Sequence, residues 1–134
     1  MSDGPAFPLT TYPVHLGTGA TVTRLEEFTG DPAWYGRYSE RTAADGAEGR
    51  LVSLHTFTAP WTDWEVHPWG EELVLCTSGA ITLHQETDDG VRTIELVAGE
   101  AAINPPGVWH TADIEDAATV VFITAGLHTR NRDR

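Results

Sequence analysis

Residues 65–79 read EVHPWGEELVLCTSG, and residues 99–110 read GEAAINPPGVWH. Glu65 and His67 stand two positions apart, so on a strand both side chains point to the same face. A short turn follows, and it lets the strand that begins at Glu72 fold back beside the first. In the second stretch a rigid proline–glycine turn fixes the start of the strand of His110. Two imidazoles and a carboxylate would then face a common interior as a facial triad, with Glu65 as a fourth candidate ligand.

Around these two stretches the sequence predicts an all-β domain. Short β-branched or aromatic runs separated by turn residues are typical of sandwiches and barrels, and no window of the sequence has a convincing helical period. The expected strands are 20–25, 51–58, 62–67, 71–77, 80–86, 91–97, 100–103, 108–114 and 119–124.

The length of 134 residues predicts a single domain. We expect an irregular lead-in over residues 1–19, a barrel over 20–126 and a tail over 127–134. Residues 26–49 carry Trp34, Tyr35 and Tyr38, and we leave open whether part of this segment is a strand or a turn. Long irregular connections are often lids or interface elements. We therefore expect a homodimer, with residues 26–49 as the candidate interface.

Charge and composition exclude several functions. A net charge of −12 repels nucleic-acid phosphates, so we expect no nucleic-acid partner. The sequence has no lysine, which excludes Schiff-base chemistry. The N-terminus lacks the features of a signal peptide, and no apolar run is long enough for a membrane helix, so no membrane partner is expected. The only cysteine, Cys76, is expected to be a small buried residue of a cytoplasmic protein.

The two motifs resemble those of the cupin superfamily. The first follows the spacing Glu65-x-His67-x4-Glu72-x6-Gly79, and the second matches Gly-x5-Pro-x-Gly-x2-His up to His110. The resemblance covers roughly residues 50–125. It implies a double-stranded β-helix, the jelly-roll barrel of small single-domain cupins, with His67, Glu72 and His110 as metal ligands.

The sequence departs from the family pattern where the first motif histidine is replaced by Glu65. Ile114 also stands where an asparagine often follows the last histidine. Glu65 could be a direct ligand, in which case two carboxylates neutralise a divalent ion and make it a weaker Lewis acid. It could instead be a catalytic general base beside the metal. In a third interpretation the site has lost its metal.

The leading functional prediction is a metal-dependent enzyme that acts on a small molecule. One divalent ion of iron, zinc, manganese or nickel would support either a dioxygenase or a Lewis-acid isomerase, cyclase or lyase. The alternatives are a non-catalytic protein that binds a small molecule and a metal-free isomerase or epimerase. Fold does not choose among these. Four tryptophans near the motifs are first expected to pack, but they also suit a pocket mouth for an apolar or aromatic ligand: Trp61, Trp64, Trp69 and Trp109. His55 and His84 could line the same pocket.

Overall fold

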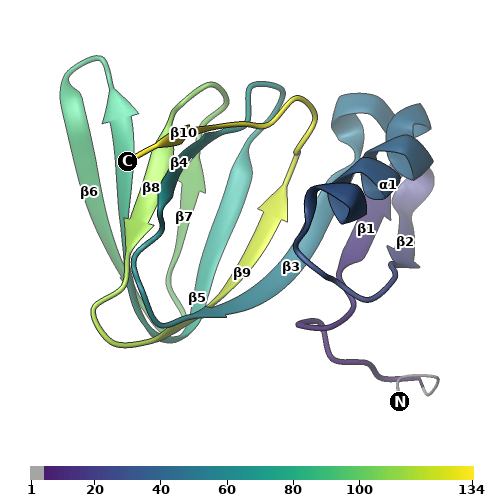
Figure 1. Ribbon diagram of the computed structural model, residues 1–134, viewed down its shortest axis with the longest axis horizontal. Coiled ribbons are helices and arrows are strands. Elements are labelled where there is room, and N and C mark those ends of the chain that lie inside the picture. The colour runs from purple at the N-terminus through teal and green to yellow at the C-terminus, as the bar shows by residue number, and fades with distance from the viewer. Residues whose placement is uncertain (1–4) are drawn as a thin grey trace.

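The computed structural model describes residues 5–134 and consists mainly of antiparallel strands (Figure 1). In chain order the elements are β1 (Val14–Gly17), η1 (Thr18–Ala20), β2 (Thr21–Arg24), α1 (Pro32–Thr42), η2 (Ala43–Glu48), β3 (Arg50–Phe57), β4 (Asp63–Val66), β5 (Glu72–Thr87), β6 (Gly90–Val97), β7 (Ala101–Asn104), β8 (His110–Asp113), β9 (Ala118–Thr124) and β10 (Arg130–Asp133). The prediction of a mostly antiparallel β fold is confirmed.

Two sheets share the long strand β5. Its first half pairs with β7 and β9, and the sheet continues through β3 and β1 to β2. Its second half pairs with β6 and β8, and that sheet continues through β4 to β10. The strand passes between the sheets at Gly79, which has φ +72°. A Cβ atom at this position would lie 2.0 Å from the carbonyl oxygen of Ala117, so the bend requires glycine.

The hydrophobic core lies between the two sheets. Its buried members come from strands β5, β6, β8 and β9 and from the residues beside them: Val74, Cys76, Ile81, Leu83, Leu96, Ala112, Ile114, Ala118, Val120 and Phe122. Cys76 is fully buried, as expected for a structural thiol. Because Glu72, Val74 and Cys76 alternate along one face of β5, the buried carboxylate of Glu72 borders this apolar interior.

The expectation of no helix is wrong for the segment of residues 26–49. This segment contains the 11-residue helix α1, followed by η2. Asp31 caps the helix by accepting a hydrogen bond from the amide of Trp34 at 2.8 Å, and Pro32 occupies the first turn. Only Trp34 is buried within α1, so the helix leaves almost no apolar period in the sequence. None of the described helices is long and apolar enough to cross a membrane.

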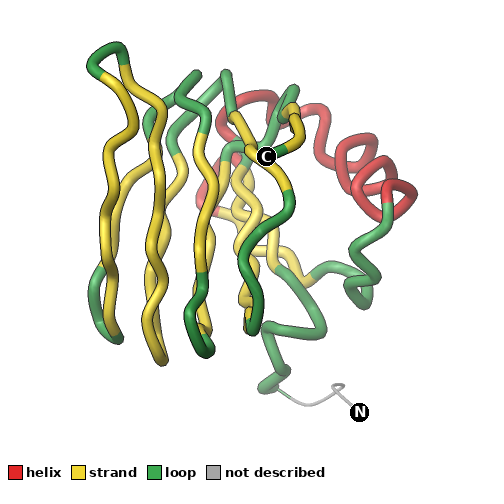
Figure 2. Tube along the Cα trace, turned by 60° about the vertical axis from the view of Figure 1, so that its left-hand side comes forward, coloured by secondary structure: helices red, strands yellow, loops and turns green. Residues whose placement is uncertain are grey.

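Helix α1 is fastened to the sheet face on which Glu72 lies. Across neighbouring strands, His15 lies opposite Leu51, Leu51 opposite Thr124, and Thr124 opposite Glu72. Residues directly opposite each other in a sheet point to the same face, so these four side chains share one face. His15 makes hydrogen-bond contacts of 2.7 Å with Tyr38 of α1 and 2.6 Å with Asp45 of η2. Figure 2 shows the helical segment on one side of the strands.

The expected lead-in contains β1 and the expected tail contains β10, while residues 1–4 lie outside the described part.

Candidate metal centre

Three strands and one turn bring Glu65, His67, Glu72 and His110 together. Glu65 lies in β4, His67 follows that strand, Glu72 begins β5 and His110 begins β8, directly opposite Glu65 in register. One ligand atom from each of the four side chains lies within 4.8 Å of the others. The pattern predicted this convergence from residues that are 45 positions apart, since 110 − 65 = 45.

The imidazole Nε2 atoms of His67 and His110 are buried and have no hydrogen-bond partner. Each nevertheless lies 3.3 Å from an oxygen of Glu72, and the Oε1 atom of Glu65 lies 3.3 Å from the first and 3.6 Å from the second. The nitrogens approach carboxylate oxygens without bonding to them. Buried polar atoms are rarely left unpaired, so this arrangement suits a cation held among the four side chains.

The other ring nitrogen of each histidine is held in a donor role. Thr129 donates its hydroxyl hydrogen to the carbonyl of Gly126 at 2.8 Å, so at 2.7 Å it accepts a hydrogen bond from Nδ1 of His67. The carbonyl oxygen of Val108 accepts from Nδ1 of His110 at 3.3 Å. In the neutral imidazoles the lone pair is therefore on Nε2 and points into the cluster. Such partners orient metal-binding histidines.

The two carboxylates differ in environment. Asn104 donates to Oε1 of Glu72 at 2.9 Å, and Thr124 donates to Oε2 at 2.6 Å. The Glu72 side chain is 3% exposed, whereas that of Glu65 is 31% exposed. The cluster is therefore closed on the side of Glu72 and open on the side of Glu65.

Charge within the cluster shifts the titration of its members. Burial alone would lower the pKa of His67 and of His110. The adjoining carboxylates of Glu65 and Glu72 have the larger effect and raise both histidine pKa values to about 9. Burial alone would raise the pKa of each carboxyl, but the two histidines outweigh it and hold both pKa values below their usual range. Without a metal the cluster is a neutral set of two imidazolium ions and two carboxylates.

A group of aromatic side chains lies within the electrostatic reach of Glu65. The ring of Phe28 lies 5.8 Å from that of Tyr35 on α1 and 5.2 Å from that of His55 on β3, measured between centroids. Desolvation raises the pKa of Tyr35, with a further contribution from the charge of Glu65. Desolvation lowers the pKa of His55 against the opposing effect of Glu65. Trp61 contacts His110 at 6.2 Å and has a buried, unpaired indole nitrogen.

The other residues that were predicted to line the pocket do not contact the cluster in the described structure, apart from Trp61. His84 makes a 2.8 Å ion pair with Asp113. Trp64 and Trp109 lie under the guanidinium groups of the last strand, and Trp69 is largely exposed. Of the four tryptophans, only Trp61 contacts a residue of the cluster in the described structure.

Sequence reasoning missed the residues that support the ligands. They are Asn104, Thr124 and Thr129. Thr124 is the one polar residue on the inner face of β9, which was a usable signal. Thr129 lies in the expected tail, and nothing in its local pattern marks it as a partner of His67.

No family model matches the sequence, and no curated protein matches it. Among solved structures, a protein with a double-stranded β-helix domain from Klebsiella pneumoniae is 22% identical, with a TM-score of 0.52 over 63% of this chain and 76% of its own. An oxalate oxidase structure is 16% identical, with a TM-score of 0.52 over 60% of this chain and 44% of its own. A cupin-2 domain protein from Shewanella frigidimarina is 20% identical, with a TM-score of 0.49 over 56% of this chain and 69% of its own. The predicted double-stranded β-helix fold is confirmed.

Proposed function

We propose that this chain, a cupin by fold, is a metal-dependent enzyme that acts on a small molecule. The observation that carries the proposal is the pair of buried Nε2 atoms on His67 and His110, which converge on two ionised carboxylates at ion-pair distance but make no hydrogen bond. A purely structural cluster would gain by bonding these nitrogens to the carboxylates. Strongly perturbed groups that converge beside an open side are typical of a functional site.

The donor set suits one divalent ion of iron, zinc, manganese or nickel, held by His67, Glu72, His110 and Glu65. Such an ion would supply Lewis-acid chemistry, or redox chemistry if it is iron or manganese. Because both carboxylates are ionised and both histidines are neutral when bound, the filled site is neutral. Glu65, whose side chain is the more exposed of the two carboxylates, would hold the ion through one oxygen and could accept a proton from a substrate through the other.

The open side suits a neutral aromatic or enolisable substrate. Phe28, Tyr35 and His55 offer ring faces, a hydroxyl and an imidazole. All eight arginines are exposed, and the ion pairs of Glu65 in the described structure are with His67 and His110. A dicarboxylate would therefore bring two uncompensated charges to a site that is neutral when filled, at a cost that low-polarity surroundings increase.

The test is metal loading followed by probe binding. Protein purified without chelator, or soaked with each of the four metals, should contain about one ion per chain by elemental analysis. His110→Ala should lose it, while His84→Gln, which alters a histidine outside the cluster, should keep it. In the cobalt-substituted protein, catechol should change the visible spectrum at concentrations where oxalate does not. Absence of metal after soaking would contradict the proposal and favour the metal-free or binding-only alternatives.

We also propose a homodimer, formed through the outer face of the first sheet rather than through residues 26–49. Trp34 and Tyr38 pack inward, so that segment offers little apolar surface. The outer face of β7, β5, β9 and β3 carries Ile103, Leu73, Leu75, Val121, Ile123, Val52 and Leu54. Leu73 and Ile103 are 37% and 52% exposed and lie opposite each other. This face has no acidic residue, so a second copy of this acidic chain meets the least repulsion there.

Light scattering should therefore give twice the 14.6 kDa chain mass. Leu73→Glu should shift the protein to the monomer mass, because it places a charge within an apolar patch, where a symmetric contact would bring two like charges close together. Val22→Glu is the control, since Val22 is exposed at the far edge of the same sheet. A monomer at high concentration for the unaltered protein would contradict the dimer.

The remaining predictions about partners and location rest on composition alone. The net charge of −12 continues to argue against nucleic-acid binding. The buried single Cys76 accords with the proposed cytoplasmic location.

A further inference from the structure

A directed series of hydrogen bonds leads from the surface to the cluster. Arg92 on β6 donates to Oε1 of Gln85 from two nitrogens, at 2.6 and 3.2 Å. Gln85 donates from Nε2 to Oδ1 of Asn104 at 2.8 Å, and Asn104 donates from Nδ2 to Oε1 of Glu72 at 2.9 Å. Gln85 is 0% exposed and Asn104 is 1% exposed. Both amides are thus isolated from water.

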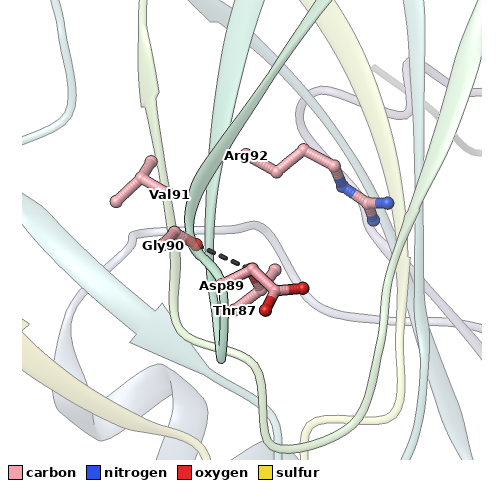
Figure 3. Close-up of a pocket in the computed structure, with 5 residues that line it drawn as sticks. All are labelled: Thr87, Asp89, Gly90, Val91 and Arg92. Atoms are coloured by element: carbon pink, nitrogen blue, oxygen red, sulfur yellow. Dashed lines mark hydrogen bonds between the residues drawn. The ribbon is translucent and has the colours of Figure 1, made fainter.

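Arg92 itself lies at a surface hollow. The hollow is lined by Thr87, Asp89, Gly90, Val91 and Arg92 and has a volume of about 450 Å³. Figure 3 shows the guanidinium of Arg92 extending away from the turn in which Thr87 bonds to Gly90. No described carboxylate forms an ion pair with Arg92. In the described structure, the side-chain hydrogen bonds of Arg92 both go to the buried amide of Gln85.

Both ends of this series favour one direction, because the Ile103 carbonyl and the Glu72 carboxylate only accept hydrogen bonds and the Arg92 guanidinium only donates them. A guanidinium has donors and no acceptor, so it selects the carbonyl side of the Gln85 amide. The Gln85 NH₂ group must then point inward, where it also donates to the carbonyl of Ile103 at 2.8 Å. An inward NH₂ group selects the carbonyl side of Asn104. The NH₂ group of Asn104 is left for Glu72.

We propose that Arg92 is a positioning residue for metal binding, because it reinforces the orientation of two buried amides from their outer end and thereby helps to keep a donor on Glu72. The proposal rests on the proposed metal site. If Asn104 were reversed, its carbonyl oxygen would face the Glu72 carboxylate across the present 2.9 Å contact, with two acceptors and no hydrogen between them. Glu72 would move away from that oxygen, and away from the position at which it meets both histidines.

Charge alone predicts the opposite effect. Arg92 is a cation, so its removal should strengthen the binding of a divalent ion if it acts only through its field. Under the proposal its removal weakens binding, because the amides lose their orientation. Arg92→Glu separates the two mechanisms most clearly, since glutamate presents only acceptors to Gln85 and draws the NH₂ group outward.

The experiment compares zinc affinity across three variants by competition with a chromophoric chelator. Arg92→Glu should bind zinc about 10-fold more weakly than the unaltered protein, at the low end of losses from residues that support metal ligands. Arg92→Lys, which remains a donor, should bind nearly normally. Arg50→Glu makes the same change of charge at an exposed position on β3 and should bind at least as well as the unaltered protein.

Two further readouts distinguish the ways in which the proposal can fail. The cobalt spectrum of Arg92→Glu should differ from that of Arg50→Glu, and in the metal-free protein the side-chain amide resonances of Gln85 and Asn104 should lose their protection from exchange. Equal or tighter zinc binding by Arg92→Glu than by Arg50→Glu, in folded protein by circular dichroism, overturns the role of Arg92 alone. If the unaltered protein binds none of iron, zinc, manganese and nickel, the proposed function fails, and unchanged amide resonances in Arg92→Glu would then reject the orientation effect independently.

Discussion

Lowering the pH from 8 to 7 should weaken zinc binding by about 100-fold, because about two protons compete with each metal ion. His67 and His110 both have a pKa of about 9, so both are protonated in the metal-free chain at neutral pH. Each must release its proton from Nε2 before it can bind. Well below pH 9, each proton contributes about a factor of 10 per pH unit. Glu65 and Glu72 remain ionised throughout this range.

The same protons have the opposite effect on the metal-free fold. A histidine whose pKa is raised above its usual value of 6.5 stabilises the folded state fully below that value, and the stabilisation is lost as the pH rises through about 9. Between pH 6.5 and 9 the chelated protein should therefore lose thermal stability. The zinc-loaded protein should keep a nearly constant stability over the same interval at saturating zinc, since its affinity for the ion rises with pH by as much as the metal-free fold loses.

Calorimetry in buffers of different ionisation enthalpy measures the proton release directly. About two protons per zinc ion should be released at pH 7, and His84→Gln should release as many, because His84 lies outside the cluster. A pH-independent affinity with no proton release would mean that zinc binds elsewhere on the chain and would remove the two histidines from the site.

The strands and the cluster could be predicted because both depend on local pattern. Side-chain alternation placed Glu65 with His67 on one face, and the turn before His110 fixed where its strand begins. The glycine at the bend of β5 was part of the same motif. In these cases a short stretch of sequence determines the geometry, and the distance along the chain between the two motifs does not matter.

Helix α1 and the support of the ligands depend on contacts that no local pattern encodes. Only Trp34 of the helix is buried, so a hydrophobic period was absent, although Asp31 and Pro32 together are a helix start that could have been used. His67 depends on Thr129, which is 62 positions away. Gln85 donates a hydrogen bond to Asn104 in the interior, although the two residues are 19 positions apart. Such pairs become visible only when the register of the strands is known.

Glu65→Gln should weaken zinc binding by about 10- to 100-fold at pH 9, because a neutral amide is a poorer donor to a divalent ion than a carboxylate. The loss of zinc affinity relative to the unaltered protein should become smaller at lower pH. Glu65 is one of the two carboxylates that raise the pKa of His67 and His110, so its neutralisation also makes these histidines easier to deprotonate. The variant thus loses a ligand but meets less competition from protons.

These two effects distinguish the roles that the sequence left open for Glu65. If Glu65 is only a general base, Glu65→Gln should bind zinc as well as the unaltered protein at pH 9 and more tightly at pH 6.5, while activity on the eventual substrate falls by about 10²- to 10⁴-fold. If it is a ligand, the variant binds more weakly at pH 9. Glu65→His, which restores the usual family residue, should then bind zinc at least as well, because it returns a donor to a position whose oxygen lies 3.3 Å from Nε2 of His67. Weak binding by Glu65→His together with normal binding by Glu65→Gln would exclude Glu65 from the ligand set and leave the ion to His67, Glu72 and His110.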